Sequence, residues 1–318
     1  MLALARRERN AALAAAGGLL WAVAVAVRGV APGVGDVAVA APPLAAFGLL
    51  ELRRQYGDRY GVAGHTGVAL LAAGLAAGFL ALLLDAFLPD AIVKLVVVGI
   101  PLVTAVACLA AGSPLVGWAL VDAGVLSRWA GVAFALAVPA SAVVNASLTP
   151  VLGVGLGVYG LAWAGLATRL WGGPDAGATV AGSGRGADGV RSVAGAVGLV
   201  LLAAELLALA ASGSTPLFGD TRPLDGGYAL LGLACLVAAV LGRRPARAAA
   251  TLGGAACLAV AAAILGAYWG HLQVSASVRI SQLFVLLPVG VTLAVAGLAG
   301  GSPPLAAVAD GDPPTEQD

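Results

Sequence analysis

Glu205 is the residue of this sequence with the clearest capacity for chemistry. It lies past the middle of the apolar run 192–212 and has Leu and Ala on both sides. An ionisable side chain inside a hydrocarbon layer is costly unless it faces water or a partner, so such groups often mark ion or proton sites. Two interpretations stay open. Glu205 either carries a proton or binds a cation, or it forms a hydrogen bond that holds two helices together.

Three further residues are candidates for substrate binding or ion coupling together with Glu205. Pro42 and Pro43 stand near the middle of the apolar run 37–52, which predicts a kinked or broken helix. The backbone groups released by such a break bind solutes near the midplane in secondary transporters. Asn145 follows Pro139 in the run 129–148 and is a candidate for the lining of a polar cavity.

Glycines at helical spacing predict close helix packing. The array Gly153, Gly155, Gly157 and Gly160 only superficially resembles a nucleotide-binding loop, because no strand precedes it and no acidic residue follows at the required distance. Inside an apolar run, small residues four apart let two backbones approach each other. We expect this role for Gly74, Gly78, Gly153 and Gly157.

One short string matches a catalytic motif in letters but not in context. Gly33-Val34-Gly35-Asp36 matches the Gly-x-Gly-Asp string of intramembrane aspartyl proteases, which need a second aspartate such as Asp85. The string falls in a turn between two runs, however, and three leucines precede Asp85 where the partner motif has Tyr-Asp. Asp36 is better suited to capping a helix, so no catalytic residue is predicted.

No metal site or cofactor is predicted either. The only histidines, His65 and His271, are expected at opposite membrane faces and therefore cannot share an ion. The three cysteines lie within apolar runs, where a thiol behaves as a small hydrophobic group. The chain also lacks the usual motifs of membrane ATPases, zinc proteases and esterases, which lowers the expectation of an enzyme.

The elements that position these residues are predicted to be membrane helices. Of the 318 residues, 60% are hydrophobic and 10% are charged, which is too few charges for a water-soluble surface. Long apolar runs favour helices over a barrel, so the fold class is an all-α polytopic bundle in a lipid bilayer. The spans are expected near 11–28, 37–52, 66–87, 91–111, 129–148, 150–169, 193–212, 226–242, 248–269 and 282–301.

Charge sets the predicted orientation. With both termini in the cytoplasm, all of the 17 basic residues except Arg28, Lys94, Arg222 and Arg279 lie on the cytoplasmic side, as the positive-inside rule requires. Residues 1–301 then form one transmembrane domain, and 302–318 form a disordered acidic tail. The segment 112–128, which begins Gly-Ser-Pro, is expected to be interfacial or re-entrant. The composition is typical of a prokaryotic plasma-membrane protein.

Ten spans divide into five and five near Thr149, and an odd number in each half makes the halves inverted in the membrane. Secondary transporters commonly have this arrangement. The leading functional hypothesis is therefore a permease for a small solute whose identity is unknown. The alternative is a non-catalytic subunit or scaffold that assembles with other membrane proteins through its glycine-rich faces. No nucleic-acid partner is expected.

Overall fold

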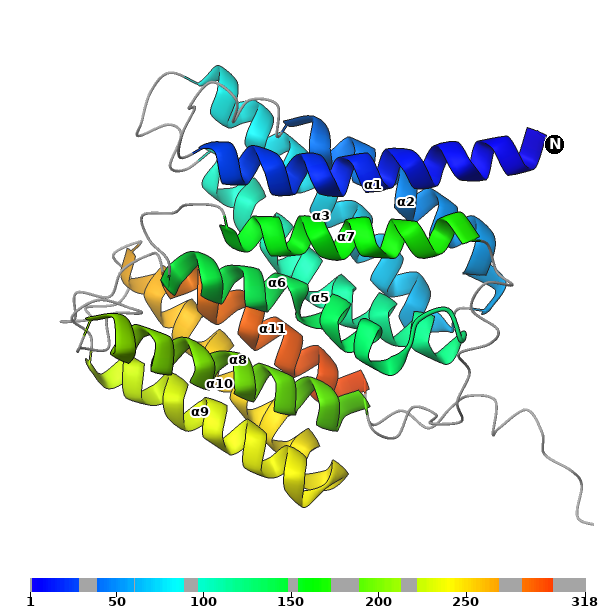
Figure 1. Ribbon diagram of the computed structural model, residues 1–318. Coiled ribbons are helices and arrows are strands. Elements are labelled where there is room, and N and C mark those ends of the chain that lie inside the picture. Colours follow the sequence, from blue (N-terminus) through cyan, green and yellow to red (C-terminus); the bar gives the residue numbers. More distant parts are fainter. Residues whose placement is uncertain are drawn as a thin grey trace, which may run out of the picture.

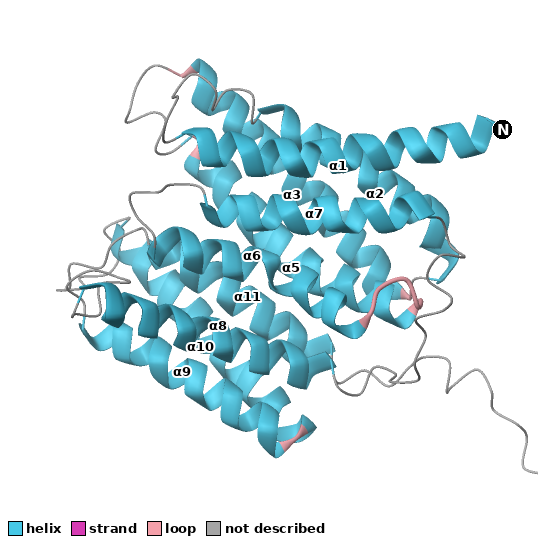
Figure 2. Ribbon diagram, viewed as in Figure 1, coloured by secondary structure: helices cyan, strands magenta, loops and turns pink. Residues whose placement is uncertain are grey.

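The part of the chain that the structure describes consists of helices and the short turns between them, and it contains no strand (Figure 2). The structure is a computed structural model, and it describes residues 2–28, 39–59, 61–88, 97–147, 154–172, 189–212, 222–268 and 282–299. These ranges hold ten α-helices and one 3₁₀ turn, and each predicted run contains one helix. The expected acidic tail, the Gly33–Asp36 string and His271 lie outside the described residues.

The helices follow one another along the chain. They are α1 (Leu2–Arg28), α2 (Ala41–Tyr56), the 3₁₀ turn η2 (Gly57–Arg59), α3 (Val62–Phe87), α5 (Gly99–Asp122), α6 (Arg128–Ser147), α7 (Val154–Gly172), α8 (Gly189–Ser212), α9 (Arg222–Leu241), α10 (Arg243–Tyr268) and α11 (Leu283–Ala299).

The helices enclose two hydrophobic cores that share α6. The first core draws its side chains from α1, α2, α3, α5, α6 and α7, and the second mainly from α6, α8, α9, α10 and α11. In Figure 1, α7 lies between α1 and α6, while α8, α9 and α10 lie in the lower part of the view, on the side of α6 away from α1. α11 packs on both α5 and α6 and so joins the two cores.

Three helices within the described ranges are long and apolar enough to cross a membrane. They are Val62–Asp85, Gly99–Asp122 and Arg243–Ala267, and three shorter apolar helices accompany them. This composition indicates association with a membrane.

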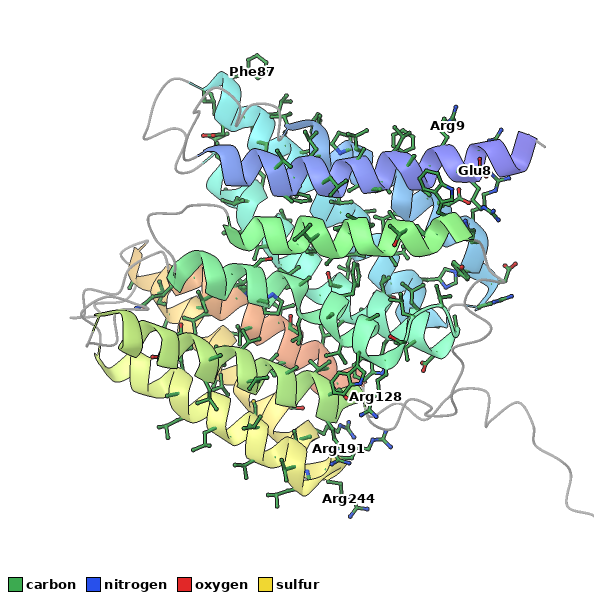
Figure 3. The ribbon with its side chains drawn as sticks, in the orientation of Figure 1. Glu8, Arg9, Phe87, Arg128, Arg191 and Arg244 are labelled. Carbon is green, nitrogen blue, oxygen red and sulfur yellow. The ribbon has the colours of Figure 1, made fainter. Side chains whose placement is uncertain are left out.

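Basic side chains gather at one end of the helices. Figure 3 shows Arg9, Arg128, Arg191 and Arg244 at this end and Phe87 at the opposite one. Arg191 Nε donates to the carbonyl of Ala239 at 2.9 Å, and Arg247 Nε donates to the carbonyl of Gly297 at 3.0 Å. Both carbonyls belong to the last turn of a helix, where the intrahelical donors are missing. The arginines therefore also cap their neighbours, and we call this the basic end.

The double proline begins a helix instead of breaking one. Pro42 and Pro43 lie in the first turn of α2, which starts at Ala41 and continues without interruption to Tyr56. The first-turn N–H groups of a helix have no intrahelical partner, so proline is tolerated there. The predicted break in the middle of this span is wrong, and the helix extends further toward the basic end than its apolar run.

The segment 112–128 is also different from the prediction. It is neither interfacial nor re-entrant over its first half, because α5 continues through Ser113 and Pro114 to Asp122. Gly124, at φ 73°, then ends the helix. Its N–H binds the carbonyl of Val121 at 3.0 Å, and the next N–H, that of Val125, binds the carbonyl of Leu120 at 2.8 Å. This pair of bonds is a Schellman motif, which favours glycine in the left-handed conformation.

Of the four glycines predicted to pack helices, two are described with their surroundings. A Cβ at Gly74 would lie 3.0 Å from the backbone nitrogen of Leu109 and still closer to its side chain, so α3 and α5 touch there. At Gly78 the nearest atom would be the Cβ of Ala105 at 3.7 Å, an ordinary contact. Gly153 lies outside the described residues, as do the surroundings of Gly157.

Candidate functional site

In the first core, α1 and α7 approach each other closely at a reciprocal crossing. A Cβ at Gly18 would lie 2.5 Å from the Gly160 carbonyl, 2.7 Å from the Ala164 nitrogen and 3.2 Å from the Trp163 Cβ. A Cβ at Gly160 would meet the three equivalent atoms of α1, namely the Gly18 carbonyl, the Ala22 nitrogen at 2.9 Å and the Trp21 Cβ at 3.2 Å. The two helices therefore cross about a local two-fold axis.

The sequence around the crossing is repeated as well. Residues 18–22 read Gly-Leu-Leu-Trp-Ala, and residues 160–164 read Gly-Leu-Ala-Trp-Ala. The glycine and the alanine four residues later give each backbone a flat face, which permits contact between antiparallel helices. In a five-plus-five division, α1 and α7 are the first helices of the two halves, so the repeat occupies equivalent positions.

Aromatic rings surround the crossing. Trp21 packs edge-on against Tyr159 with ring centroids 5.4 Å apart, and Tyr159 and Trp163 are related in the same way at 6.4 Å. Phe134, from α6, stands edge-on to Trp163 at 5.8 Å. Tryptophan in membrane proteins usually lies at the interface, where its N–H reaches water. Here Trp163 is fully buried in the middle of α7.

Three buried polar atoms lie beside these rings. They are the Tyr159 hydroxyl, the Trp163 indole nitrogen and the Ser113 hydroxyl, which we name the Tyr159 cluster. The exposed fraction is 1% for Tyr159 and 0% for both others. Ser113 of α5 and Trp163 of α7 both interact with the Tyr159 hydroxyl. A buried polar group left unsatisfied costs about 1–3 kcal/mol, so these mutual interactions favour the contact between α5 and α7.

Pro114 adds a further polar group one turn from Ser113. Because proline has no N–H, it leaves the carbonyl of Ala110 without its usual helical donor. Thr292 of α11 replaces that donor, with 3.2 Å between its Oγ1 and the Ala110 oxygen. Both residues are fully buried. At this point α5 lacks one backbone hydrogen bond, and a side chain of α11 replaces it. The position is one turn from Ser113 of the Tyr159 cluster.

A second buried polar group, which we name the Glu51 cluster, links three helices toward the basic end. Asn10 Nδ2 of α1 donates to Glu51 Oε2 at 3.0 Å, and Gln55 Nε2 donates to Glu51 Oε1 at 2.8 Å. Gln55 Nε2 also lies 3.4 Å from the carbonyl of Leu170 in α7. The exposed fraction of Glu51 is 2%. Both carboxylate oxygens accept a hydrogen bond, so the role of this cluster is to hold α1, α2 and α7 together.

Glu205 is buried in the second core, with an exposed fraction of 8%. The antiparallel pair α8 and α9 is close-packed: a Cβ at Gly195 would touch Ala239, one at Gly198 would touch Leu236, and one at Gly232 would touch Leu202. Continuing this register places Tyr228, which is also buried, level with Glu205. The structure does not bring Glu205 to the Tyr159 cluster, because the two belong to different cores.

The other predicted site residues are dispersed. Pro42 and Pro43 belong to the first turn of α2, and Asn145 lies near the end of α6 with its side chain outside what the structure describes. His65 is exposed at the start of α3, and its Nδ1 lies 3.2 Å from the carbonyl of Gly61. The described ranges contain no group of three His, Cys, Asp or Glu side chains placed to hold a metal ion.

Comparisons with known proteins add no family to this description. No protein-family model, no curated protein and no solved structure matches the chain. The fold and its buried polar groups define the class only: an all-helical protein with helices able to cross a membrane.

Proposed function

We propose that the protein is a permease for a small solute, with about ten spans, in the plasma membrane of a prokaryote. The observation that carries the proposal is the reciprocal crossing of α1 and α7, made by the repeated Gly-Leu-x-Trp-Ala segments. A local two-fold relation between the first helices of two inverted halves is the symmetry from which secondary transporters derive their two alternating openings.

The position of the Tyr159 cluster supports the same function. In inverted-repeat transporters the solute binds at the interface of the repeats near the midplane. The cluster adjoins the α1 and α7 crossing, joins α5 to α7, and consists of three fully buried polar side chains. Alternating access then requires that this region open to one side of the membrane at a time.

Sided labelling of Ser113→Cys tests the proposal. The variant is made in a chain whose three native cysteines, all free thiols, are replaced by alanine. Uncharged hydroxyethyl methanethiosulfonate is added outside right-side-out and inverted vesicles, with glutathione trapped inside each. If the protein is a permease, the thiol of Ser113→Cys reacts in both orientations, because this position is exposed to each side of the membrane in turn.

Val62→Cys is the matched control for this experiment. Val62 begins α3 at the basic end and has an exposed fraction of 73%. It is expected to react in the inverted vesicles alone, which verifies that glutathione confines the reagent to one side. A Ser113→Cys thiol that is protected in both orientations would count against a permease and in favour of a membrane scaffold.

A further inference from the structure

Five arginines lie together at the basic end of the second core, and we name them the arginine patch: Arg128, Arg191, Arg243, Arg244 and Arg247. Hydrogen bonds hold the helices that carry them side by side. Arg128 Nη2 of α6 donates to Ser192 Oγ of α8 at 2.8 Å, and Arg191 of α8 donates to the Ala239 carbonyl of α9. Only Gly242 separates α9 from α10, whose Arg247 donates to the last turn of α11. Figure 3 accordingly shows Arg128, Arg191 and Arg244 close to one another.

The arginines of the patch stand at the beginnings of three helices, where a cation is unfavourable. α6 begins at Arg128, Arg191 is the third residue of α8, and α10 begins at Arg243. The partial positive charge of a helix N-terminus repels a cation and attracts an anion. The first turns of α6, α8 and α10 contain no acidic residue that would offset this charge. An anion at this place is therefore stabilised by the arginine side chains and by the helix ends alike.

The first core has arginines at the same end but in a different setting. Arg53 and Arg54 are exposed in the last turn of α2, where the helix dipole favours a cation. Acids accompany them in the sequence, because Glu51 precedes them and Asp58 follows. The positive-inside rule accounts for basic residues at this end of either core, but not for their concentration at the starts of helices.

Exposed apolar side chains continue from the patch along the outside of the second core. Val240 and Leu241 end α9, Leu252 lies on α10, and each of the three is at least 70% exposed. Trp129, which follows Arg128, is also exposed, and exposed tryptophan is typical of the level of lipid headgroups. A ligand that fits both surfaces has an anionic head and apolar chains.

We infer that the arginine patch binds the headgroup of an anionic phospholipid whose acyl chains lie along α9 and α10. Guanidinium groups bind phosphate through paired N–H donors, and clusters of basic residues beside membrane helices attract anionic headgroups. The inference goes beyond the proposed function and does not depend on transport. The acidic segment 302–318 is the competing anion within the chain. A lipid is favoured over it because a lipid also covers the exposed apolar side chains.

Lipid titration followed by native mass spectrometry tests the inference on the full-length protein in a neutral detergent. The Kd of the first lipid adduct is measured for phosphatidylglycerol and for phosphatidylcholine with the same acyl chains. We expect phosphatidylglycerol to bind roughly tenfold more tightly, and this advantage to be lost in the Arg243→Gln/Arg244→Gln variant. If that variant is not monodisperse, Arg244→Gln alone is expected to show a smaller loss in the same direction.

Arg53→Gln/Arg54→Gln is the matched control, because it removes an adjacent pair of exposed arginines from the same end of the first core. Its Kd for phosphatidylglycerol should remain at the value of the parent protein. Equal losses in the two double variants would overturn the inference, because they would show a response to net charge alone. Equal affinity for the two lipids, or no adduct with either, would overturn it as well.

A further full-length variant separates the lipid from the acidic segment 302–318. It carries Asp310→Asn, Asp312→Asn, Glu316→Gln and Asp318→Asn. An unchanged Kd for phosphatidylglycerol supports the lipid as the occupant of the patch. Binding of phosphatidylglycerol that appears only in this variant would assign the patch to the acidic segment and overturn the inference.

Discussion

Gly160→Ala lowers the free energy of unfolding by about 1–3 kcal/mol, the usual cost of an extra methyl group in a packed interior. The new Cβ would meet the Gly18 carbonyl and the Ala22 nitrogen, which are backbone atoms and cannot rotate away. The crossing of α1 and α7 must then widen. Steric-trapping measurements in bicelles give the free energy directly.

Gly165→Ala is the matched control on the same helix. No atom lies within 4 Å of a Cβ built at Gly165, so the same chemical change meets open space. Alanine is the better helix former by roughly 0.5–1 kcal/mol, and this variant should be as stable as the parent or more so. Equal effects at Gly160 and Gly165 would contradict the close crossing on which the proposed symmetry depends.

Glu51→Ala removes the carboxylate that accepts hydrogen bonds from the buried Asn10 and the half-buried Gln55, and it has the second largest expected effect. Asn10 Nδ2 is then left without its acceptor, which costs roughly 1–3 kcal/mol, whereas Gln55 Nε2 keeps the Leu170 carbonyl. We expect a loss of stability that is visible as a lower midpoint in thermal unfolding followed by size-exclusion chromatography. Glu51→Gln retains one acceptor oxygen and should lose less.

The control for Glu51 is an acid at the same end of the molecule. Asp58 is exposed in the 3₁₀ turn η2, so Asp58→Ala should leave the midpoint within error. A Glu51→Ala variant as stable as Asp58→Ala would show that the Glu51 cluster contributes nothing to stability. That result would favour a role for Glu51 in ion or proton coupling.

The sequence predicted where helices occur but not where they begin and end. Hydropathy located one helix in every apolar run, because burial of apolar side chains determines which segments are helical. The predictions that were wrong are those that treated a proline as the place where a helix breaks or ends. Pro42 begins α2 within its first turn, and Pro114 is accommodated inside α5 because Thr292 supplies the missing donor from a helix far away in sequence. A single sequence contains no signal for that compensation.

The candidate sites were predictable to different degrees. The burial of Glu205 follows from its apolar neighbours, and the structure agrees. Glu51 is equally buried but precedes Arg53 and Arg54, so hydropathy alone assigns it to the end of a span. Trp163 was detectable in principle, because a tryptophan in the middle of an apolar run has no interfacial water for its N–H. The repeated Gly-Leu-x-Trp-Ala segment was the other available signal.

The most direct test of alternating access is a pair of distances measured by double electron–electron resonance in nanodiscs. Spin labels are placed on exposed positions of the two cores: Val62 with Val240 at the basic end, and Phe87 with Leu230 toward the other end. The account predicts two populated distances for each pair, with the shorter distance at one end accompanying the longer distance at the other. One narrow distance at both ends, under all solute conditions, would contradict a permease.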